Sequence, residues 1–314
     1  MGEGHPGQYT DGPMSAPSSS PAIRPLDLGR VLTALNRLAA GGVPPWLHGE
    51  VARRMAERLD IIRLKPLVLV DWWGLAGAGG DLLSKAYPEA RRIIVEPTEA
   101  LRERSRQASR SGWWPWRRAA PEVVAPDDLM PEGAQLVWAN MMLHAVADPP
   151  AVLARWHRAL AVDGFVMFSC LGPDTLRELR DLYAALGWPT PMAAFIDMHD
   201  LGDMLVHAGF ADPVMDQETL RLSWADPEAL LAELRGLGGN AAPDRFAGLR
   251  TPRWRKRLLA ELERLRGSDG RLHLRFEVAY GHAFKALPRR AASSETTVSL
   301  EEMRSLVRHR GAGT

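Results

Sequence analysis

The sequence of 314 residues contains a single cysteine, Cys170. One cysteine cannot form a disulfide within the chain, and the nine histidines show no Cys/His spacing typical of zinc sites. We therefore expect neither a disulfide framework nor a bound metal. A reducing, cytoplasmic environment fits this composition best.

The chain also lacks an excess of charge. Lys and Arg total 39 against 38 Asp and Glu, a net charge of +1. Such a balance favours neither nucleic acid nor an anionic membrane as partner. No apolar run approaches the roughly 18 residues that suggest a membrane span. We expect a monomer, with a disordered leader over residues 1–25, one domain over 26–290 and a flexible tail over 291–314.

Several catalytic motifs are missing as well. The sequence contains no nucleophile elbow, no Ser-His-Asp order and no phosphate-binding loop of the GxxxxGK[ST] type. Hydrolase and nucleoside triphosphatase activities are therefore unsupported. An enzyme that transfers a group by positioning two ligands is compatible with what remains.

What the sequence does contain is an alternation of short apolar runs and amphipathic segments. This pattern predicts an α/β, doubly wound, seven-stranded sheet with one antiparallel strand and a helical insertion at about residues 223–270. The predicted strands are residues 67–70, 92–96, 123–125, 135–139, 165–170, 214–222 and 272–284. The last has apolar residues at every second position, which predicts a half-exposed strand near a sheet edge.

Residues that follow each of the first three predicted strands are candidates for binding a nucleotide-like ligand. The segment from Gly74 to Gly80 also contains Gly77 and Gly79 and precedes a helix, so its backbone could approach a ligand or simply reverse the chain. Glu96 ends the second strand, where a carboxylate can accept hydrogen bonds from a ribose diol. Asp127 or Asp128, after the third strand, could accept from an adenine amino group or cap a turn.

Polar residues also follow the fourth and fifth strands. Asn140 and His144 come after the run ending at Ala139, and the turn Gly172-Pro173-Asp174 follows Cys170. The carboxyl ends of parallel strands meet at one edge of a sheet, so these groups should lie together. A Trp-rich loop, Trp113 to Trp116, could contact a partner or merely cover the sheet.

Beyond these local patterns, four blocks carry a resemblance to a known family: LVWANMMLHAVADP, FSCLGPDTLRELR, DMHDLGDMLVHAGFADPVMD and FEVAYGHAFK. They resemble class I S-adenosylmethionine-dependent methyltransferases of the BioC-type malonyl-acyl carrier protein O-methyltransferase family of biotin synthesis. The resemblance implies a Rossmann-like sheet, S-adenosylmethionine as cofactor, and an acyl carrier protein or acyl thioester substrate with a free carboxylate under a helical lid.

The cofactor loop departs from the family pattern D-x-G-x-G-x-G. Counting back from Tyr87-Pro88 places Trp73 at the acidic position and Leu75 at the first glycine, and keeps only Gly77 and Gly79. A shifted register uses Asp71 and Gly74 instead, in a longer loop. The chain thus resembles a divergent member, in which Leu75 could narrow the cofactor site.

The resemblance implies roles for these residues: Asp71, Gly74, Gly77, Gly79, Glu96, Asp127 and Asn140 toward the cofactor, and His144 and Arg177 toward the reacting carboxylate. Arg177 could bind a carboxylate with two hydrogen bonds, or lie on a solvated helix face. Two other readings stay open: an inactive paralogue that binds a protein partner, and an arginine hydroxylase like a related mitochondrial branch.

Overall fold

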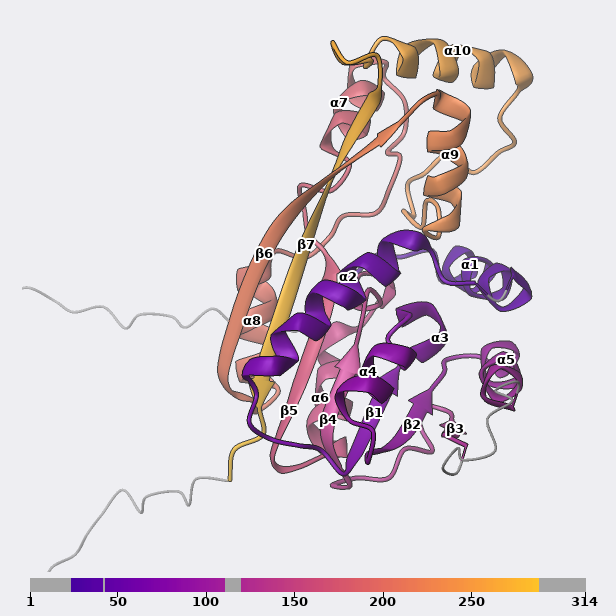
Figure 1. Cartoon of the computed structure of the whole chain (residues 1–314). Coiled ribbons are helices and arrows are strands. Elements are labelled where there is room, and N and C mark those ends of the chain that lie inside the picture. Colours follow the sequence, from indigo (N-terminus) through magenta and orange to yellow (C-terminus); the bar gives the residue numbers. More distant parts are fainter. Residues whose placement is uncertain (1–23, 42, 111–119, 288–314) are drawn as a thin grey trace, which may run out of the picture.

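The computed structural model describes residues 24–41, 43–110 and 120–287. Its centre is a seven-stranded sheet in the order β3-β2-β1-β4-β5-β7-β6 (Figure 1). β7 is antiparallel to both its neighbours, and the other pairings are parallel, so the predicted class and its single antiparallel strand are confirmed. The strands are β1 (Val68–Trp72), β2 (Arg91–Val95), β3 (Glu122–Val124), β4 (Ala134–Ala139), β5 (Leu160–Leu171), β6 (Ala211–Trp224) and β7 (Leu272–Phe284).

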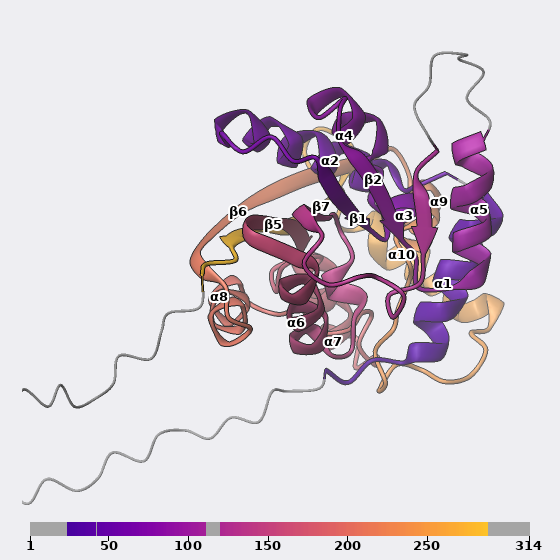
Figure 2. The same ribbon diagram turned by 90° about the horizontal axis from the view of Figure 1, so that it is seen from below.

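Helices cover both faces of the sheet, as Figure 2 shows from below. Leu47 of α2 and Leu83 of α4 pack on one face, whereas Leu101 of α5 and Trp156 of α6 pack on the other. The α-helices are α1 (Leu28–Gly41), α2 (Trp46–Glu57), α3 (Gly74–Gly77), α4 (Gly80–Ala86), α5 (Glu99–Arg110), α6 (Pro149–Ala159), α7 (Arg177–Ala185), α8 (Met198–His207), α9 (Pro227–Gly236) and α10 (Pro252–Glu263). Short 3-10 turns, η1 (Arg58–Ile61) and η2 (Leu143–Ala145), complete the described elements.

The central strands are mainly apolar because both of their faces are covered. In β4, Leu136 and Trp138 belong to the hydrophobic cluster on the side of α2 and α4. Val137 and Ala139 belong to the cluster on the side of α5 and α6, and all four residues are fully buried. A strand buried on both faces reads as a continuous apolar run instead of an alternating one. The brief apolar runs in the sequence therefore mark the centre of the sheet.

β7 differs from its predicted environment. It lies near the sheet edge as predicted, between β5 and the edge strand β6, but most of its residues are buried and it is not half-exposed. Val278 is buried on one face, while Ala279 and Ala283 are buried on the other. The second face carries the small residues Ala279, Gly281 and Ala283. A prediction based on large apolar residues therefore missed the burial of this face.

β6 and β7 extend together beyond the rest of the sheet, and the chain forms α9 and α10 between them (Figure 1). These two helices fall within residues 223–270, the segment of the predicted lid. The folded part also begins earlier than residue 26, because Arg24 is buried and its guanidinium donates to the backbone oxygen of His144 at 2.8 Å. The predicted leader up to residue 23, the tail and the Trp113–Trp116 loop lie outside the described residues.

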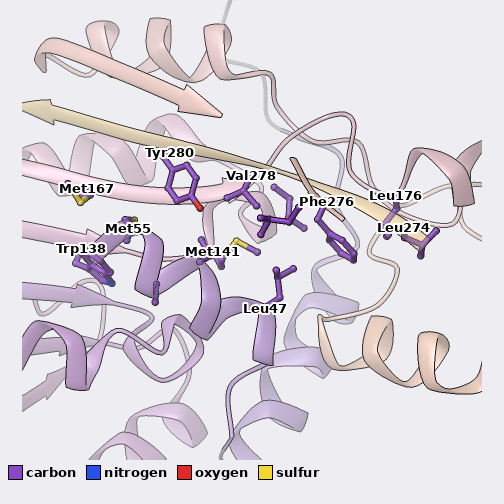
Figure 3. Packing of buried hydrophobic residues seen from close by; sticks show 14 of the residues in the cluster. Leu47, Met55, Trp138, Met141, Met167, Leu176, Leu274, Phe276, Val278 and Tyr280 are labelled. Carbon is purple, nitrogen blue, oxygen red and sulfur yellow. The ribbon is translucent and has the colours of Figure 1, made fainter. Parts of the chain in front are cut away.

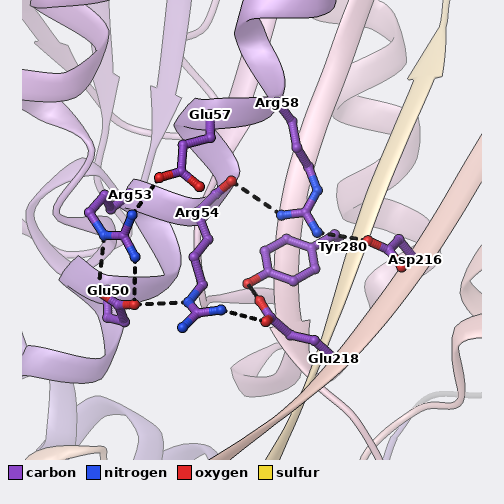
Figure 4. A network of polar contacts seen from close by, with 8 residues as sticks. All are labelled: Glu50, Arg53, Arg54, Glu57, Arg58, Asp216, Glu218 and Tyr280. Carbon is purple, nitrogen blue, oxygen red and sulfur yellow. Dashed lines mark hydrogen bonds and ion pairs between the residues drawn. The ribbon is translucent and has the colours of Figure 1, made fainter.

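A network of charged side chains fastens α2 to the extended strands (Figure 4). Arg54 pairs with Glu218 of β6 at 2.6 Å, and Arg58 pairs with Asp216 at 2.7 Å. The Arg58 guanidinium also lies 3.9 Å from the centre of the Tyr280 ring, a cation–π contact. The network fixes the helix that leads to the carboxyl ends of the strands.

None of the helices in the described ranges is both long and apolar enough to cross a lipid bilayer.

The contact between Gly281 and the core yields the first prediction. A Cβ at Gly281 would lie 2.2 Å from Cε1 of Phe168, a fully buried ring. Gly281→Ala should therefore destabilise the fold by about 1–3 kcal/mol, the usual cost of overpacking, measured by urea unfolding. Gly133→Ala is the control, because nothing lies within 4 Å of its Cβ position. Equal unfolding free energies for the two variants would contradict this packing.

Candidate functional site

The turn after β1 is more compact than the predicted glycine loop. Trp73 and Ala78 adopt left-handed φ angles of 56° and 55°, and between them Gly74–Gly77 forms the single turn α3. The Trp73 amide donates to the oxygen of Val95 at 2.7 Å, and the Gly77 amide donates to that of Trp73 at 2.8 Å. Backbone hydrogen bonds thus close the turn over the ends of β1 and β2.

Asp71 lies beneath this turn. It is fully buried within β1, and both the Nε and Nη2 atoms of Arg92 donate to its Oδ2, at 3.0 and 2.6 Å. Burial raises the pKa of its carboxyl, and the neighbouring guanidinium opposes that rise. A Cβ at Gly74 would lie 2.8 Å from this carboxylate, which explains the glycine. Asp71 therefore faces Arg92 and the turn.

Glu96 is also completely buried. Its Oε1 accepts hydrogen bonds from the Leu75 amide and the Ser105 hydroxyl, both at 2.8 Å, while Oε2 has no partner among the described residues. Burial raises the pKa of its carboxyl from 4.5 to about 7, partly offset by these two hydrogen bonds. Glu96 stands at the predicted strand end, with the Leu75 turn closed over it.

Asn140 connects four segments. Its Nδ2 donates to the oxygens of His48, at 2.8 Å, and Gly77, at 2.6 Å, and its Oδ1 accepts from the Ser169 hydroxyl at 2.6 Å. A Cβ at Gly77 would touch Asn140, and one at Gly79 would lie 2.5 Å from Nε1 of Trp138. Gly79 therefore allows the turn to pack on Trp138 of β4, whereas a Cβ at Gly77 would make an ordinary contact.

Two of the predicted site residues lie apart from this cluster. Asp127 is largely exposed and pairs with Arg155 at 2.8 Å. Arg177 is exposed at the start of α7 and lies 3.6 Å from Asp174. Asp174 does not cap α7, because Leu176 directly precedes the helix, and the Asp174 amide donates to Glu277. The structure gives no geometric support to the predicted roles of Asp127 and Arg177.

A cavity of about 390 Å³ opens beside the turn, at the carboxyl ends of the strands. Its walls are mostly apolar and come from α1, α3, α7, α9 and β7; Figure 3 shows Leu176 and Phe276 on the β7 side. His144, Trp73 and Ala76 line it near the turn. Of the predicted site residues, only His144 borders the cavity.

His144 is held in its neutral form. Burial, together with the nearby His48 and Arg24, lowers the pKa of His144 from 6.5 to about 3. The Leu171 amide donates to its Nδ1 at 3.4 Å, so the proton of the neutral ring belongs on Nε2. The ring therefore offers an N–H donor that does not titrate near neutral pH.

His48 is a cavity residue that the sequence did not reveal. Its Nδ1 donates to the oxygen of Ala76 at 2.8 Å, and burial lowers its pKa from 6.5 to about 4. The neutral ring thus keeps its Nε2 as an acceptor. His48 lies in a helix with no motif of its own, so only the packing of α2 against α3 identifies it.

The buried carboxyl of Glu96 gives the second prediction. Because its pKa in the folded state exceeds the unfolded value, the protein should lose stability as the pH rises from about 4.5 to about 7, by roughly 3 kcal/mol from this group. Glu96→Gln keeps the acceptor oxygen and removes the titration. The difference in unfolding free energy between the two proteins should change across that window and level off above it; a pH-independent difference would contradict the buried carboxyl.

No protein-family model matches the chain. The fold is nevertheless shared with solved structures. One is a crystal structure assigned to a methyltransferase from Bacillus halodurans C-125, which matches with a TM-score of 0.51 and 13% identity over 75% of this chain and 100% of that one. At that identity the likeness concerns the fold alone.

Curated relatives are much closer in sequence. The malonyl-acyl carrier protein O-methyltransferase of Gallionella capsiferriformans is 39% identical over 273 residues, which cover 84% of this chain and 93% of the relative. The protein of the same name from Laribacter hongkongensis is 40% identical over 274 residues, covering 84% and 92%. The chain therefore belongs to the malonyl-acyl carrier protein O-methyltransferase family.

Proposed function

We propose that this protein is an S-adenosylmethionine-dependent O-methyltransferase that esterifies the free carboxylate of a malonyl thioester on acyl carrier protein, as in biotin synthesis. Membership in the family carries the proposal. The cavity at the strand ends, with a neutral His144 on its wall, supports it. We also propose that the protein works in the cytoplasm.

The residues around the turn have the chemistry that this cofactor requires. One carboxylate oxygen of Glu96 has no partner in the part of the chain that the structure describes, and it could accept the hydrogen bond of a ribose hydroxyl. Its other oxygen is taken by the Leu75 amide and by Ser105, and Glu96 does not line the cavity. We propose that Glu96 would hold the ribose once the Gly74–Gly80 turn moves away from it.

The reaction requires little covalent catalysis by the protein. The bound cofactor would supply a methyl group on a positively charged sulfur, and an ionised carboxylate is already a nucleophile. The protein's task is therefore to orient the carboxylate and to keep water out. The His144 Nε2–H can donate to one carboxylate oxygen, and the apolar walls around it exclude water.

The inactive-paralogue reading gains nothing from the comparisons, since the relatives named above are all methyltransferases. The arginine hydroxylase reading is likewise without support there.

The proposed activity predicts a defined product. Incubated with S-adenosylmethionine and malonyl-acyl carrier protein, the purified protein should yield a thioester heavier by one methyl group, detected by mass spectrometry of the intact carrier. Succinyl- or acetyl-loaded carrier serves as a control, and the acetyl form has no carboxylate to methylate. Calorimetric titration with the cofactor tests binding separately. Absence of both binding heat and product would reject the enzyme in favour of a protein-binding paralogue.

The neutral donor on His144 gives a further prediction. His144→Phe removes the N–H while keeping an aromatic ring beside Phe195, whose centre lies 5.7 Å from the imidazole. We expect kcat/KM to fall by about 10- to 100-fold, the usual scale for misplaced reactants. Because the pKa of His144 is about 3, the ratio of wild-type to variant rates should stay constant between pH 5.5 and 8. A ratio that changes near pH 6.5 would show instead that the ring titrates during catalysis.

A further inference from the structure

A second pocket adjoins the cavity on the side away from the glycine turn. Four arginines line it, and no carboxylate does: Arg30 of α1, Arg235 of α9, and Arg245 and Arg250 of the segment between α9 and α10. Four guanidinium groups from three separate segments repel one another unless an anion lies among them. The pocket therefore has the composition of an anion site.

Only one of these charges is strongly compensated within the described residues. Arg245 pairs with Asp27, and this contact lowers the pKa of that carboxyl. Asp27 also lies near Arg30, but no ion pair joins the side chain of Arg30, Arg235 or Arg250 to a described carboxylate. The charge that remains in the pocket is positive.

Arg250 is held in place by aromatic rings. Its guanidinium lies 3.9 Å from the centre of Phe246 and 4.2 Å from that of Trp254. Stacking of this kind orients the planar group and leaves its N–H donors free at the edge. A stacked guanidinium is therefore prepared to donate two hydrogen bonds to a phosphate.

The arginine pocket and the apolar cavity form one continuous path. Arg30, Tyr183, Pro191, Arg235 and Asn240 line both. Asn240 holds this junction together, because its Nδ2 donates to the oxygen of Thr190 at 2.7 Å. A ligand with a phosphate at one end and a long uncharged chain would thus extend from the arginines toward His144.

We propose that the arginine pocket binds the phosphate of a 4′-phosphopantetheine thioester, whose uncharged arm occupies the apolar cavity. The inference rests on the proposed function for the identity of the acyl group. The phosphopantetheine arm is common to acyl carrier protein and coenzyme A, and the pocket recognises the part that they share. The arm then delivers the terminal carboxylate to the histidine end of the cavity.

The proposal is tested by binding, independently of turnover. Calorimetric titration of the full-length protein compares 4′-phosphopantetheine with pantetheine, which lacks the phosphate. We expect the phosphate to tighten binding at least 10-fold, and the double variant R30Q/R235Q to reduce that difference, because only Arg245 and Arg250 then remain in the pocket. R253Q/R255Q is the matched control, because Arg253 and Arg255 are exposed on α10 and line neither pocket. Its preference for the phosphate should be unchanged.

Equal affinities of the wild-type protein for the two probes would overturn the proposal. So would an equal loss in the control variant, since that would indicate a general effect of surface charge. The comparison is repeated with coenzyme A and with holo-acyl carrier protein to identify which of them supplies the phosphopantetheine arm. A loss of affinity for either ligand in R30Q/R235Q supports the pocket. Phosphate-dependent binding without methyl transfer would refute the proposed function and leave this inference intact.

Discussion

The buried hydrogen bonds of the Asn140 side chain are the constraint on which the rest of the site depends. The amide group reaches α2 through the oxygen of His48, the glycine turn through that of Gly77, and β5 through Ser169. A buried amide left without partners costs about 1–3 kcal/mol for each unsatisfied group. These three segments are therefore fixed relative to one another at the carboxyl end of β4. Asn140 positions the walls of the cavity instead of lining it.

Burial also decides the charge state of the groups near the cavity. His48 and His144 are neutral because the surrounding protein disfavours the imidazolium form, and burial raises the pKa of the Cys170 thiol to about 12, which keeps it protonated. Arg24 near His144 is buried and donates to backbone oxygens, whereas the four arginines of the second pocket lie at the other end of the path. An anionic ligand end therefore meets charge at the arginines and neutral donors at His144. This asymmetry gives the path a direction.

Much of the sheet could be predicted from the sequence, because strands buried on both faces leave short apolar runs. The predicted strand 272–284 coincides with β7, and 135–139 lies within β4. The predicted half-exposure of β7 was wrong, because Ala279, Gly281 and Ala283 are small and gave no signal of a second buried face. His48 and the arginine pocket could not be predicted, because they depend on contacts between distant segments. Asp127 looked plausible from its place after a strand, but nothing in a sequence indicates that such a side chain turns toward Arg155.

The altered turn after β1 shows how a turn that carries Trp73 and Leu75 can keep this topology. A left-handed conformation costs an ordinary residue about 1–2 kcal/mol, and Trp73 bears that cost. Burial of its large ring contributes an opposing term of about 1.5–3 kcal/mol. The hydrogen bonds that hold the turn involve the backbone of Trp73, Leu75 and Gly77, so they tolerate a change of side chain. The Leu75 backbone amide donates to Glu96, the carboxylate that we propose for the ribose. Under that proposal, closure of the turn and binding of the cofactor compete for one side chain.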